Sequence, residues 1–259
     1  EVYRVGNKFS NYPIFCLWYI LKFRKIADYV IDIENGIPYF TPLYVRKPKI
    51  LLVHHIHKKV FFQELPWFIA WLPYLLEVYL MPLVYRKSKV IAVSNETKKE
   101  LCKIGFKPEQ IFLSYNAIAH EKAIIKPKFK NPTIFSMGRV EKYKRIELLI
   151  NLFEELNYPD SKLIIGGDGR HLETIKKKVE NSKYKDRIKV LGRISEEEKF
   201  DLFAKSWLYA TASSAEGWGI TVLEANACNT PAISFDVPGL NEAIKDGING
   251  YVAKDYQDF

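Results

Sequence analysis

The sequence predicts a doubly wound α/β protein made of two domains. Short apolar runs rich in β-branched residues alternate with longer segments of helical periodicity along the whole chain, which is the order of parallel strands connected by helices. The chain has 259 residues, of which 48% are hydrophobic and 27% charged. This length suits two domains of ordinary size, and this composition excludes the disordered and fibrous classes.

The predicted strands fall into two groups. The first group comprises residues 29–33, 49–54, 89–93 and 111–114, and the second comprises 133–137, 162–165, 187–191, 208–212, 232–235 and 251–253. Between them, residues 121–132 (EKAIIKPKFKNP) are basic, contain two prolines and lack apolar periodicity, which predicts a linker. We therefore place the domains at residues 1–125 and 126–259.

Charge and cysteine content narrow the function only in part. A formal charge of +9 suits nucleic acid, anionic lipid or phosphorylated small molecules alike. The cysteines Cys16, Cys102 and Cys228 are few, odd in number and far apart, so neither a disulfide framework nor a zinc site is predicted. The first ten residues are polar and lack the pattern of a signal peptide. We expect a cytoplasmic protein.

Two aromatic segments bear on membranes and nucleic acids. Residues 65–84 are apolar but contain three prolines and Glu77, so we expect a helix that does not span a membrane. A buried helix of the first domain is the favoured interpretation, and an aromatic face touching a bilayer is the alternative. Residues 11–25 mix aromatic and basic side chains at spacings that suit an amphipathic helix better than a base-stacking platform. No nucleic-acid partner is expected.

A glycine-containing motif follows the predicted strand at 208–212. Residues 213–223 (SSAEGWGITVL) lead from that strand into a helical pattern. A helix amino terminus offers free N–H groups and a positive dipole end, which favour a phosphate or diphosphate. The expected binding residues are Gly217, Gly219, Ile220 and Thr221.

Two acidic residues in this motif have different expected roles. Glu216 lies in the loop and Glu224 lies about two turns into the helix. Glu224 is expected to hold a ribose diol, whereas Glu216 is expected to contact a sugar or a developing positive charge. Taken alone, the motif is more often an ordinary helix start with an acid nearby.

A basic motif follows the predicted strand at 133–137. Residues 138–149 (GRVEKYKRIELL) supply an arginine fork and a lysine point charge, which together suit a diphosphate leaving group. Considered alone, such a motif is more often a set of solvated surface charges. The expected site residues are Gly138, Arg139 and Lys144, whereas Lys142 and Arg145 are expected to be solvated.

Two further strand ends carry glycine. In residues 166–170 (GGDGR), Gly167, Asp168 and Gly169 permit a tight turn and close approach of a ligand. The next strand ends in Arg193 and Ile194, which line either a nucleobase pocket or a plain surface turn. Neither GxxxxGK[ST] nor GxGxxG is present, so a phosphate-binding P-loop and a nicotinamide enzyme are not predicted.

The order of these motifs resembles retaining glycosyltransferases of family 4. The resemblance runs nearly continuously over residues 134–252 and includes EGWGITVLEANACNTPAI. It implies the GT-B fold, in which two Rossmann-like domains face a central crevice. Both domains are expected to be incomplete here, without the first strand and its Gly-rich loop and without the carboxyl-terminal crossing helix. It assigns Glu216 and Glu224 to the donor signature ExxxxxxxE, and Arg139 and Lys144 to the donor diphosphate.

Three histidines crowd the end of the predicted strand at 49–54. In similar enzymes a histidine here reaches the sugar of the donor or the reacting centre. His55 and His57 share one face of the strand, so one of them is expected in the crevice, whereas His54 is expected to pack away from it. No cysteine or acidic ligand is expected beside them, and Glu34 is interpreted as a strand-end residue. No metal site is therefore predicted.

The resemblance implies transfer of a hexose from a nucleoside diphosphate sugar to the hydroxyl of a glycan or lipid-linked acceptor, with retention of configuration. No metal or other cofactor is expected, because basic side chains and a helix end already offset the phosphate charge. Peripheral association with an anionic membrane surface on its inner face is compatible with this activity. The alternative is a noncatalytic membrane-surface or nucleotide-binding protein with a relic donor pocket.

Overall fold

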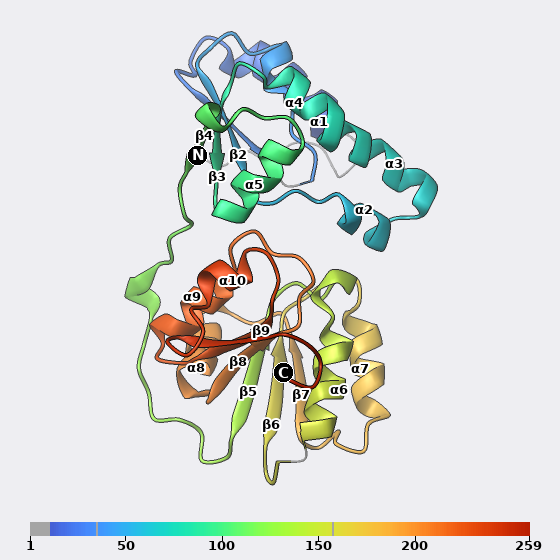
Figure 1. Ribbon diagram of the computed structural model, residues 1–259, viewed down its shortest axis with the longest axis vertical. Coiled ribbons are helices and arrows are strands. Elements are labelled where there is room, and N and C mark those ends of the chain that lie inside the picture. Colours follow the sequence, from blue (N-terminus) through green and yellow to red (C-terminus); the bar gives the residue numbers. More distant parts are fainter. Residues whose placement is uncertain (1–10, 35, 157) are drawn as a thin grey trace. The chain divides into compact units, whose positions relative to one another are not determined.

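The computed structural model describes residues 11–34, 36–156 and 158–259, and it confirms the α/β class (Figure 1). The chain forms two compact units, Glu1–Tyr115 and Asn116–Phe259, each built on a parallel sheet. Every predicted strand is present, and its ends lie within one residue of the prediction. The first ten residues, for which the sequence predicts no signal peptide, lie outside the described part of the chain.

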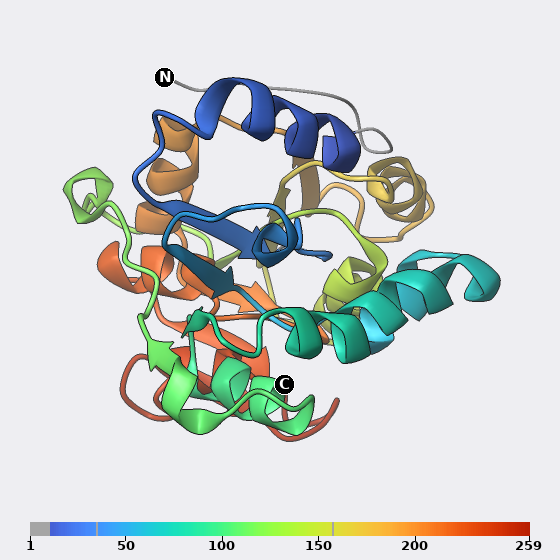
Figure 2. The ribbon, with the colours of Figure 1, turned by 90° about the horizontal axis from the view of Figure 1, so that it is seen from above.

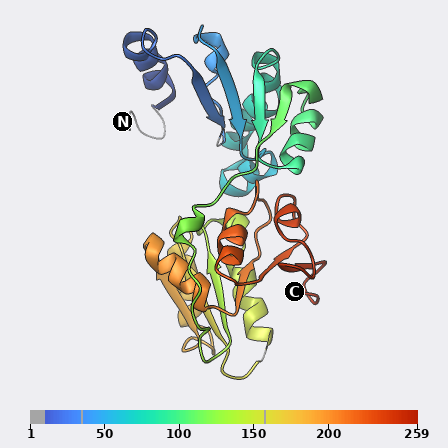
Figure 3. The ribbon, with the colours of Figure 1, turned by 90° about the vertical axis from the view of Figure 1, so that its left-hand side faces the viewer.

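The first unit contains a four-stranded sheet in the order β1-β2-β3-β4 (Figure 3). Its strands are β1 (Val30–Glu34), β2 (Lys49–Val53), β3 (Lys89–Ala92) and β4 (Ile111–Leu113). Its helical elements are α1 (Asn11–Trp18), η1 (Tyr19–Phe23), η2 (Thr41–Leu43), α2 (Lys59–Glu64), α3 (Trp67–Leu75), η3 (Leu76–Leu80), α4 (Met81–Val84), α5 (Asn95–Lys103) and η4 (Pro108–Gln110). Aliphatic side chains of β2 and β3 form the core with Tyr85 and Leu101.

The second unit contains a six-stranded sheet in the order β10-β9-β8-β5-β6-β7. Its strands are β5 (Thr133–Met137), β6 (Lys162–Gly166), β7 (Ile188–Gly192), β8 (Leu208–Thr211), β9 (Ala232–Phe235) and β10 (Gly250–Ala253). Its helical elements are η5 (His120–Lys122), η6 (Lys142–Lys144), α6 (Ile146–Leu156), α7 (Leu172–Glu180), α8 (Glu196–Lys205), α9 (Ile220–Ala227) and α10 (Leu240–Ala243).

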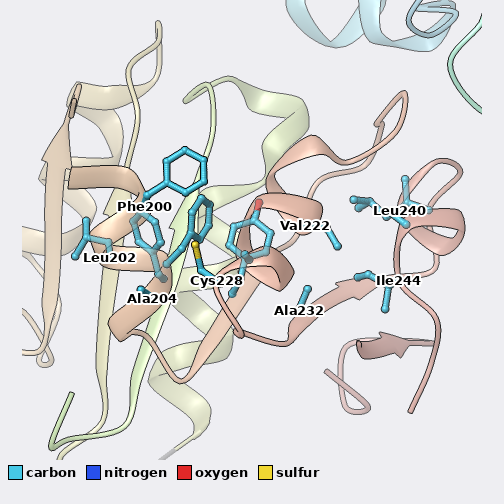
Figure 4. Close-up of a cluster of buried hydrophobic side chains, with 14 residues drawn as sticks. Phe200, Leu202, Ala204, Val222, Cys228, Ala232, Leu240 and Ile244 are labelled. Atoms are coloured by element: carbon cyan, nitrogen blue, oxygen red, sulfur yellow. The ribbon is translucent and has the colours of Figure 1, made fainter. Parts of the chain in front are cut away.

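Helices cover both faces of this second sheet (Figure 1). Because successive strand side chains point to opposite faces, each of the strands β5 to β9 contributes to two hydrophobic clusters. One cluster joins the sheet to α8, α9 and α10 (Figure 4), and the other joins it to α6 and α7. In the first cluster the Phe203 ring packs edge-on against Phe135 and Tyr209, with centroids 5.1 and 5.5 Å away, a favourable aromatic geometry.

The order of the strands places a switch point beside β5. The chain proceeds from β5 through β6 to β7, then returns to the other side of β5 and continues from β8 through β9 to β10. In open α/β sheets the connections leave on opposite faces at such a point, and the crevice at the strand carboxyl ends binds ligands. The loops after Met137 and Thr211 flank this crevice.

The aromatic segment of the first unit is helical, as predicted, but it is not a buried helix. Residues of α3, η3 and α4 form one run, Trp67–Val84, of which only 22% is buried. Ala70, Pro73, Glu77 and Met81 recur every three or four residues and face the core, so the opposite face is left outward. Figure 2 shows this run as one continuous helical rod. By length and composition alone it could cross a membrane.

The predicted linker packs against the second unit. The structure divides after Tyr115, earlier than the predicted boundary at residue 125. The backbone N–H of Phe129 donates to the Lys205 carbonyl at 2.8 Å, the Trp207 indole donates to the Phe129 carbonyl at 2.7 Å, and Lys126 pairs with Asp201 at 2.5 Å. These contacts cannot be read from the composition of the segment.

Candidate functional site

The loops after β5 and β8 meet through an ion pair. The Lys144 ammonium, on the first loop, donates to Oε1 of Glu216 on the second loop. Both side chains are largely buried, with exposed fractions of 15% and 18%. The residues predicted to hold a diphosphate and a sugar are therefore brought together at the switch point.

Tyr143 supports both cations of the first loop. Its hydroxyl accepts a hydrogen bond from the Arg139 guanidinium at 2.9 Å, and the Lys144 ammonium lies 5.2 Å from the centroid of its ring. Tyr143 itself is buried, with an exposed fraction of 8%. A cation over an aromatic face is held by the ring quadrupole, so Tyr143 fixes where the positive charge lies.

Arg145 is a structural residue, contrary to the prediction that it is solvated. Its guanidinium donates to the carbonyls of Ala212 and Ser213 at 2.5 and 3.2 Å and lies over the Phe235 ring. Burial lowers the pKa of Arg145. A left-handed backbone at Arg145 (φ 49°) precedes α6, and the side chain ties the start of that helix to the end of β8. Lys142 is exposed, as predicted.

The glycines after β6 allow two backbones to touch. The backbone of Gly167 has φ 129°, and a Cβ there would lie 1.8 Å from the Gly138 carbonyl oxygen. A Cβ at Gly169 would lie 2.4 Å from the Val140 carbonyl oxygen. The Asp168 carbonyl accepts from the Val140 N–H at 2.9 Å, while its carboxylate accepts from the Gly169 N–H at 2.8 Å. The three residues thus brace the loop that carries Arg139.

The start of α9 is shaped by two further glycines. Gly219 precedes the helix with φ 76°, and a Cβ there would lie 2.9 Å from the Leu240 side chain. A Cβ at Gly239 would lie 2.5 Å from the Glu216 carbonyl oxygen. The same Cβ at Gly239 would lie 3.0 Å from the carbonyl carbon of Gly217. The helix therefore begins at Ile220 with its amino terminus beside Glu216.

Thr221 is anchored through its side chain. Its hydroxyl lies 2.7 Å from the Tyr209 hydroxyl, which also donates to the Met137 carbonyl at 3.2 Å. Burial raises the pKa of Tyr209, so the phenol stays protonated. The Tyr209 hydroxyl thereby links the end of β5 to the first turn of α9. Any phosphate contact of Thr221 is left to its backbone N–H.

Glu224 is held by a lysine from α8. The Lys199 ammonium lies 2.8 Å from the Glu224 carboxylate and 2.9 Å from the Glu196 carboxylate. Burial works against the charged form of Lys199, but the hydrogen bonds and charges of the two glutamates outweigh it and raise its pKa. Glu224 therefore has a fixed position and one carboxylate oxygen committed to Lys199.

The pair after β7 lies farther from the switch point, because β7 pairs with β6 and not with β5. Arg193 is exposed. Ile194 packs into the first cluster, and a Cβ at Gly166 would lie 3.1 Å from its side chain. The Gly192 carbonyl accepts from the Gly167 N–H at 2.7 Å. The end of β7 is therefore hydrogen-bonded to the loop after β6. The nucleobase role of Arg193 and Ile194 stays a prediction.

The histidines of the first unit have acidic neighbours, which corrects the prediction that none lies beside them. Nδ1 of His57 lies 3.1 Å from Glu77 and 3.4 Å from Glu34, and the His55 and His57 rings are 3.9 Å apart. Potential metal-ligand atoms of Glu34, His57 and Glu77 all lie within 4.8 Å of one another. The ion-pair geometry accounts for these distances without a metal. Burial lowers the pKa of His54.

Comparison with known proteins agrees with this arrangement. Residues 107–259 match the family described as glycosyl transferases group 1. The chain belongs to this family. It is 26% identical over 166 residues to a phosphatidylinositol N-acetylglucosaminyltransferase subunit of Arabidopsis thaliana, covering 61% of this chain and 37% of that protein. It is 32% identical over 122 residues to N-acetyl-alpha-D-glucosaminyl L-malate synthase of Bacillus anthracis, covering 47% of this chain and 32% of that protein.

Solved structures share the GT-B fold of the group 1 family. HepE of Anabaena, in complex with UDP and glucose, superposes with a TM-score of 0.78 at 16% identity, over 97% of this chain and 71% of that chain. The GT-B prediction is thereby confirmed. The chain spans about a third of the length of the two curated relatives named above.

Sequence reasoning missed several residues that build the site. Tyr143 lies between two predicted site residues, so its position was a usable signal. Lys199 is distant from Glu224 in the sequence, as Glu77 is from His57. Nothing in a single sequence pairs residues across such distances. Arg145 was misassigned because only the fold brings its side chain to the end of β8.

Replacing Gly167 with Ala tests the close contact between the two loops. We expect Gly167→Ala to lower the free energy of unfolding of the second unit by about 3 kcal/mol or more, because the new Cβ meets the Gly138 carbonyl in a backbone conformation already strained for alanine. Gly247→Ala is the matched control, since its φ is also positive but its Cβ meets nothing within 4 Å, and it should cost about 1 kcal/mol. Equal losses in urea unfolding would show that the contact is absent.

Proposed function

We propose that this chain forms the donor-binding part, and some of the acceptor-side part, of an enzyme that transfers a hexose from a nucleoside diphosphate sugar to an acceptor hydroxyl. One observation carries the proposal: the Lys144–Glu216 ion pair joins a cationic loop to an acidic one at the switch point of the second sheet. The cationic loop can bind a diphosphate, and the acidic loop can bind a sugar. The relatives named above include glycosyltransferases, and HepE holds UDP and glucose, which supports a sugar-nucleotide donor.

The proposed role of the cationic loop is to stabilise the leaving diphosphate. An ammonium has three donors, and the bond to Glu216 uses one of those of Lys144. Arg139 supplies a second charge, and the amino terminus of α9 supplies backbone N–H groups and a positive dipole end. Fixed charges in a partly buried site stabilise the negative charge that develops during bond breaking. On this proposal the transfer needs no divalent metal.

The two glutamates have separate proposed roles. Glu224 is proposed to accept hydrogen bonds from the ribose diol with the oxygen that Lys199 does not engage. Glu216 is proposed to contact the sugar or the positive charge that develops at its anomeric carbon. Retention of configuration and the participation of His55 or His57 belong to the same proposal. Arg193 and Ile194 would then lie on the nucleobase side.

Removing one cation tests the leaving-group role. In the full-length protein, Lys144→Ala or Arg139→Ala should lower turnover about 100-fold to 1,000-fold, because each removes a charge that acts on the diphosphate. Lys142→Ala is the control, since Lys142 lies in the same turn but is exposed. Turnover is measured as nucleoside diphosphate released from the donor. Unchanged turnover in both site variants would remove the diphosphate assignment.

We further propose that the acceptor is presented at an anionic membrane surface on the cytoplasmic side. The outward face of the Trp67–Val84 run is aromatic and aliphatic, with exposed fractions of 71% for Trp67, 64% for Phe68 and 64% for Leu72. The only charged residue of the run, Glu77, is buried. An outward face of this kind suits the boundary between lipid head groups and acyl chains.

Two exposed basic residues, Arg86 and Lys87, follow this run. Cationic side chains near a bilayer gain free energy from anionic head groups. The name of the Arabidopsis relative points to a phosphatidylinositol acceptor for that protein, which supports a lipid-linked acceptor for this chain.

Vesicle flotation tests the membrane proposal. The protein should float with vesicles containing phosphatidylglycerol but bind vesicles of phosphatidylcholine alone at least tenfold more weakly, and added salt should weaken binding by screening. The double variant Trp67→Ser/Phe68→Ser should lose most binding, whereas Leu43→Ser, which is 70% exposed elsewhere in the first unit, should not. Binding that does not depend on lipid charge and is unchanged in the double variant Trp67→Ser/Phe68→Ser would contradict the proposal.

A further inference from the structure

His57 has one ring nitrogen enclosed by two buried carboxylates from different elements. Its Nδ1 faces Glu77 at 3.1 Å and Glu34 at 3.4 Å, and both glutamate side chains are fully buried. A carboxylate can only accept from Nδ1, so this nitrogen carries a proton. The other ring nitrogen, Nε2, is then the remaining hydrogen-bonding atom of the ring, and the His57 side chain keeps an exposed fraction of 11%.

Glu77 lies on the core-facing side of its helix. It belongs to η3 (Leu76–Leu80), a π-helical segment between α3 and α4, and π segments are frequent at functional sites. Its two carboxylate oxygens accept from the backbone N–H groups of His57 and Lys58 at 2.7 and 2.8 Å. Glu77 thus fixes the backbone and the ring of His57 together.

Glu34 completes the enclosure from the end of β1. Its Oε1 accepts from the Gly36 N–H at 2.7 Å, while its Oε2 is buried without a hydrogen-bond partner among the described residues. Burial raises the pKa of Glu34, and the hydrogen bond and charge of His57 act in the opposite direction. A buried carboxylate so placed needs the positive ring beside it.

Among the side chains around Glu34 and Glu77, His57 is the one that carries the positive charge. Phe61 stacks on its ring with centroids 5.2 Å apart, and His55 packs on it at 3.9 Å. The Lys58 ammonium is engaged by Glu100 at 2.5 Å. Burial works against the charged form of His57, but the hydrogen bonds and charges of Glu34 and Glu77 outweigh it and raise the pKa of His57 to about 9.

We propose that Glu34 and Glu77 are positioning residues that hold the His57 ring so that Nε2–H is a permanent, cationic hydrogen-bond donor at the carboxyl edge of the first sheet. The bound group is an oxygen of the substrate, as in a sugar hydroxyl or a phosphate. This inference rests on the proposed function and sharpens it, because His57 then donates to the substrate and does not remove a proton from the acceptor at neutral pH.

The protonation of His57 can be measured directly by NMR on histidine-labelled protein. In the wild type the His57 ring should titrate near pH 9, and in Glu77→Gln or Glu34→Gln its pKa should fall toward the ordinary value of about 6.5, because the charge that favours the imidazolium is removed. Glu100→Gln is the matched control, since Glu100 pairs with the adjacent Lys58 but not with His57, and it should leave the titration unchanged.

The pH profile of transfer gives the second measurement. Wild-type kcat/KM should fall only as the pH rises through about 9, where Nε2–H is lost. If Glu77→Gln brings the pKa to about 7, kcat/KM should be about tenfold lower at pH 8 than at pH 6. His57→Gln keeps an uncharged amide donor and should show no such fall. A purely structural role for Glu77 would instead lower activity equally at every pH.

Three results would overturn the proposal. They are a wild-type His57 that titrates near 6.5, a Glu77→Gln profile parallel to the wild type, and a stoichiometric rise in melting temperature with zinc that Glu34→Gln abolishes. The last result would make the cluster a metal site. The wild-type titration decides the matter even if the variants fail to fold. It does not depend on turnover, so absence of transfer would count against the proposed function alone.

Discussion

The candidate site depends on the parallel pairing of β5 with both β6 and β8. Each pairing fixes the register of two neighbouring strands, and the carboxyl ends of parallel strands lie at the same edge of a sheet. The loops after Met137, Gly166 and Thr211 are therefore forced together, although they are far apart in the sequence. The ion pair of Lys144 with Glu216 and the bonds from Arg145 to Ala212 and Ser213 then lock two of these loops in place.

Local sequence patterns were sufficient to predict the strands and the class of fold. Short β-branched runs between helical segments predict parallel strands wherever both faces are covered, and the hydrophobic clusters on the two faces of the second sheet show that this condition holds. Motif order added the GT-B assignment. The ends of the strands and the tight turns at glycines were predictable because each depends on residues that are neighbours in the sequence.

Contacts between distant residues could not be predicted in the same way. Tyr143 supports Arg139 and Lys144 only because η6 turns its ring beneath them, and Lys199 reaches Glu224 only because α8 packs beside α9. The outward face of the Trp67–Val84 run was misassigned for a related reason: its composition is that of a core helix, and exposure depends on which elements cover it. His57 gains its carboxylates from β1 and η3, on either side of it in the sequence.

A thermal-shift series with UDP-, GDP- and ADP-sugars tests the central claim most directly, namely that the second unit binds a nucleoside diphosphate sugar at its switch point. A ligand that binds only the folded protein, at about 100 times its Kd, stabilises it by about 2.7 kcal/mol. At least one sugar nucleotide should therefore raise the melting temperature by about 5 °C or more, and Arg139→Ala should abolish the shift. No shift with any of the three, at millimolar concentration, would contradict the account.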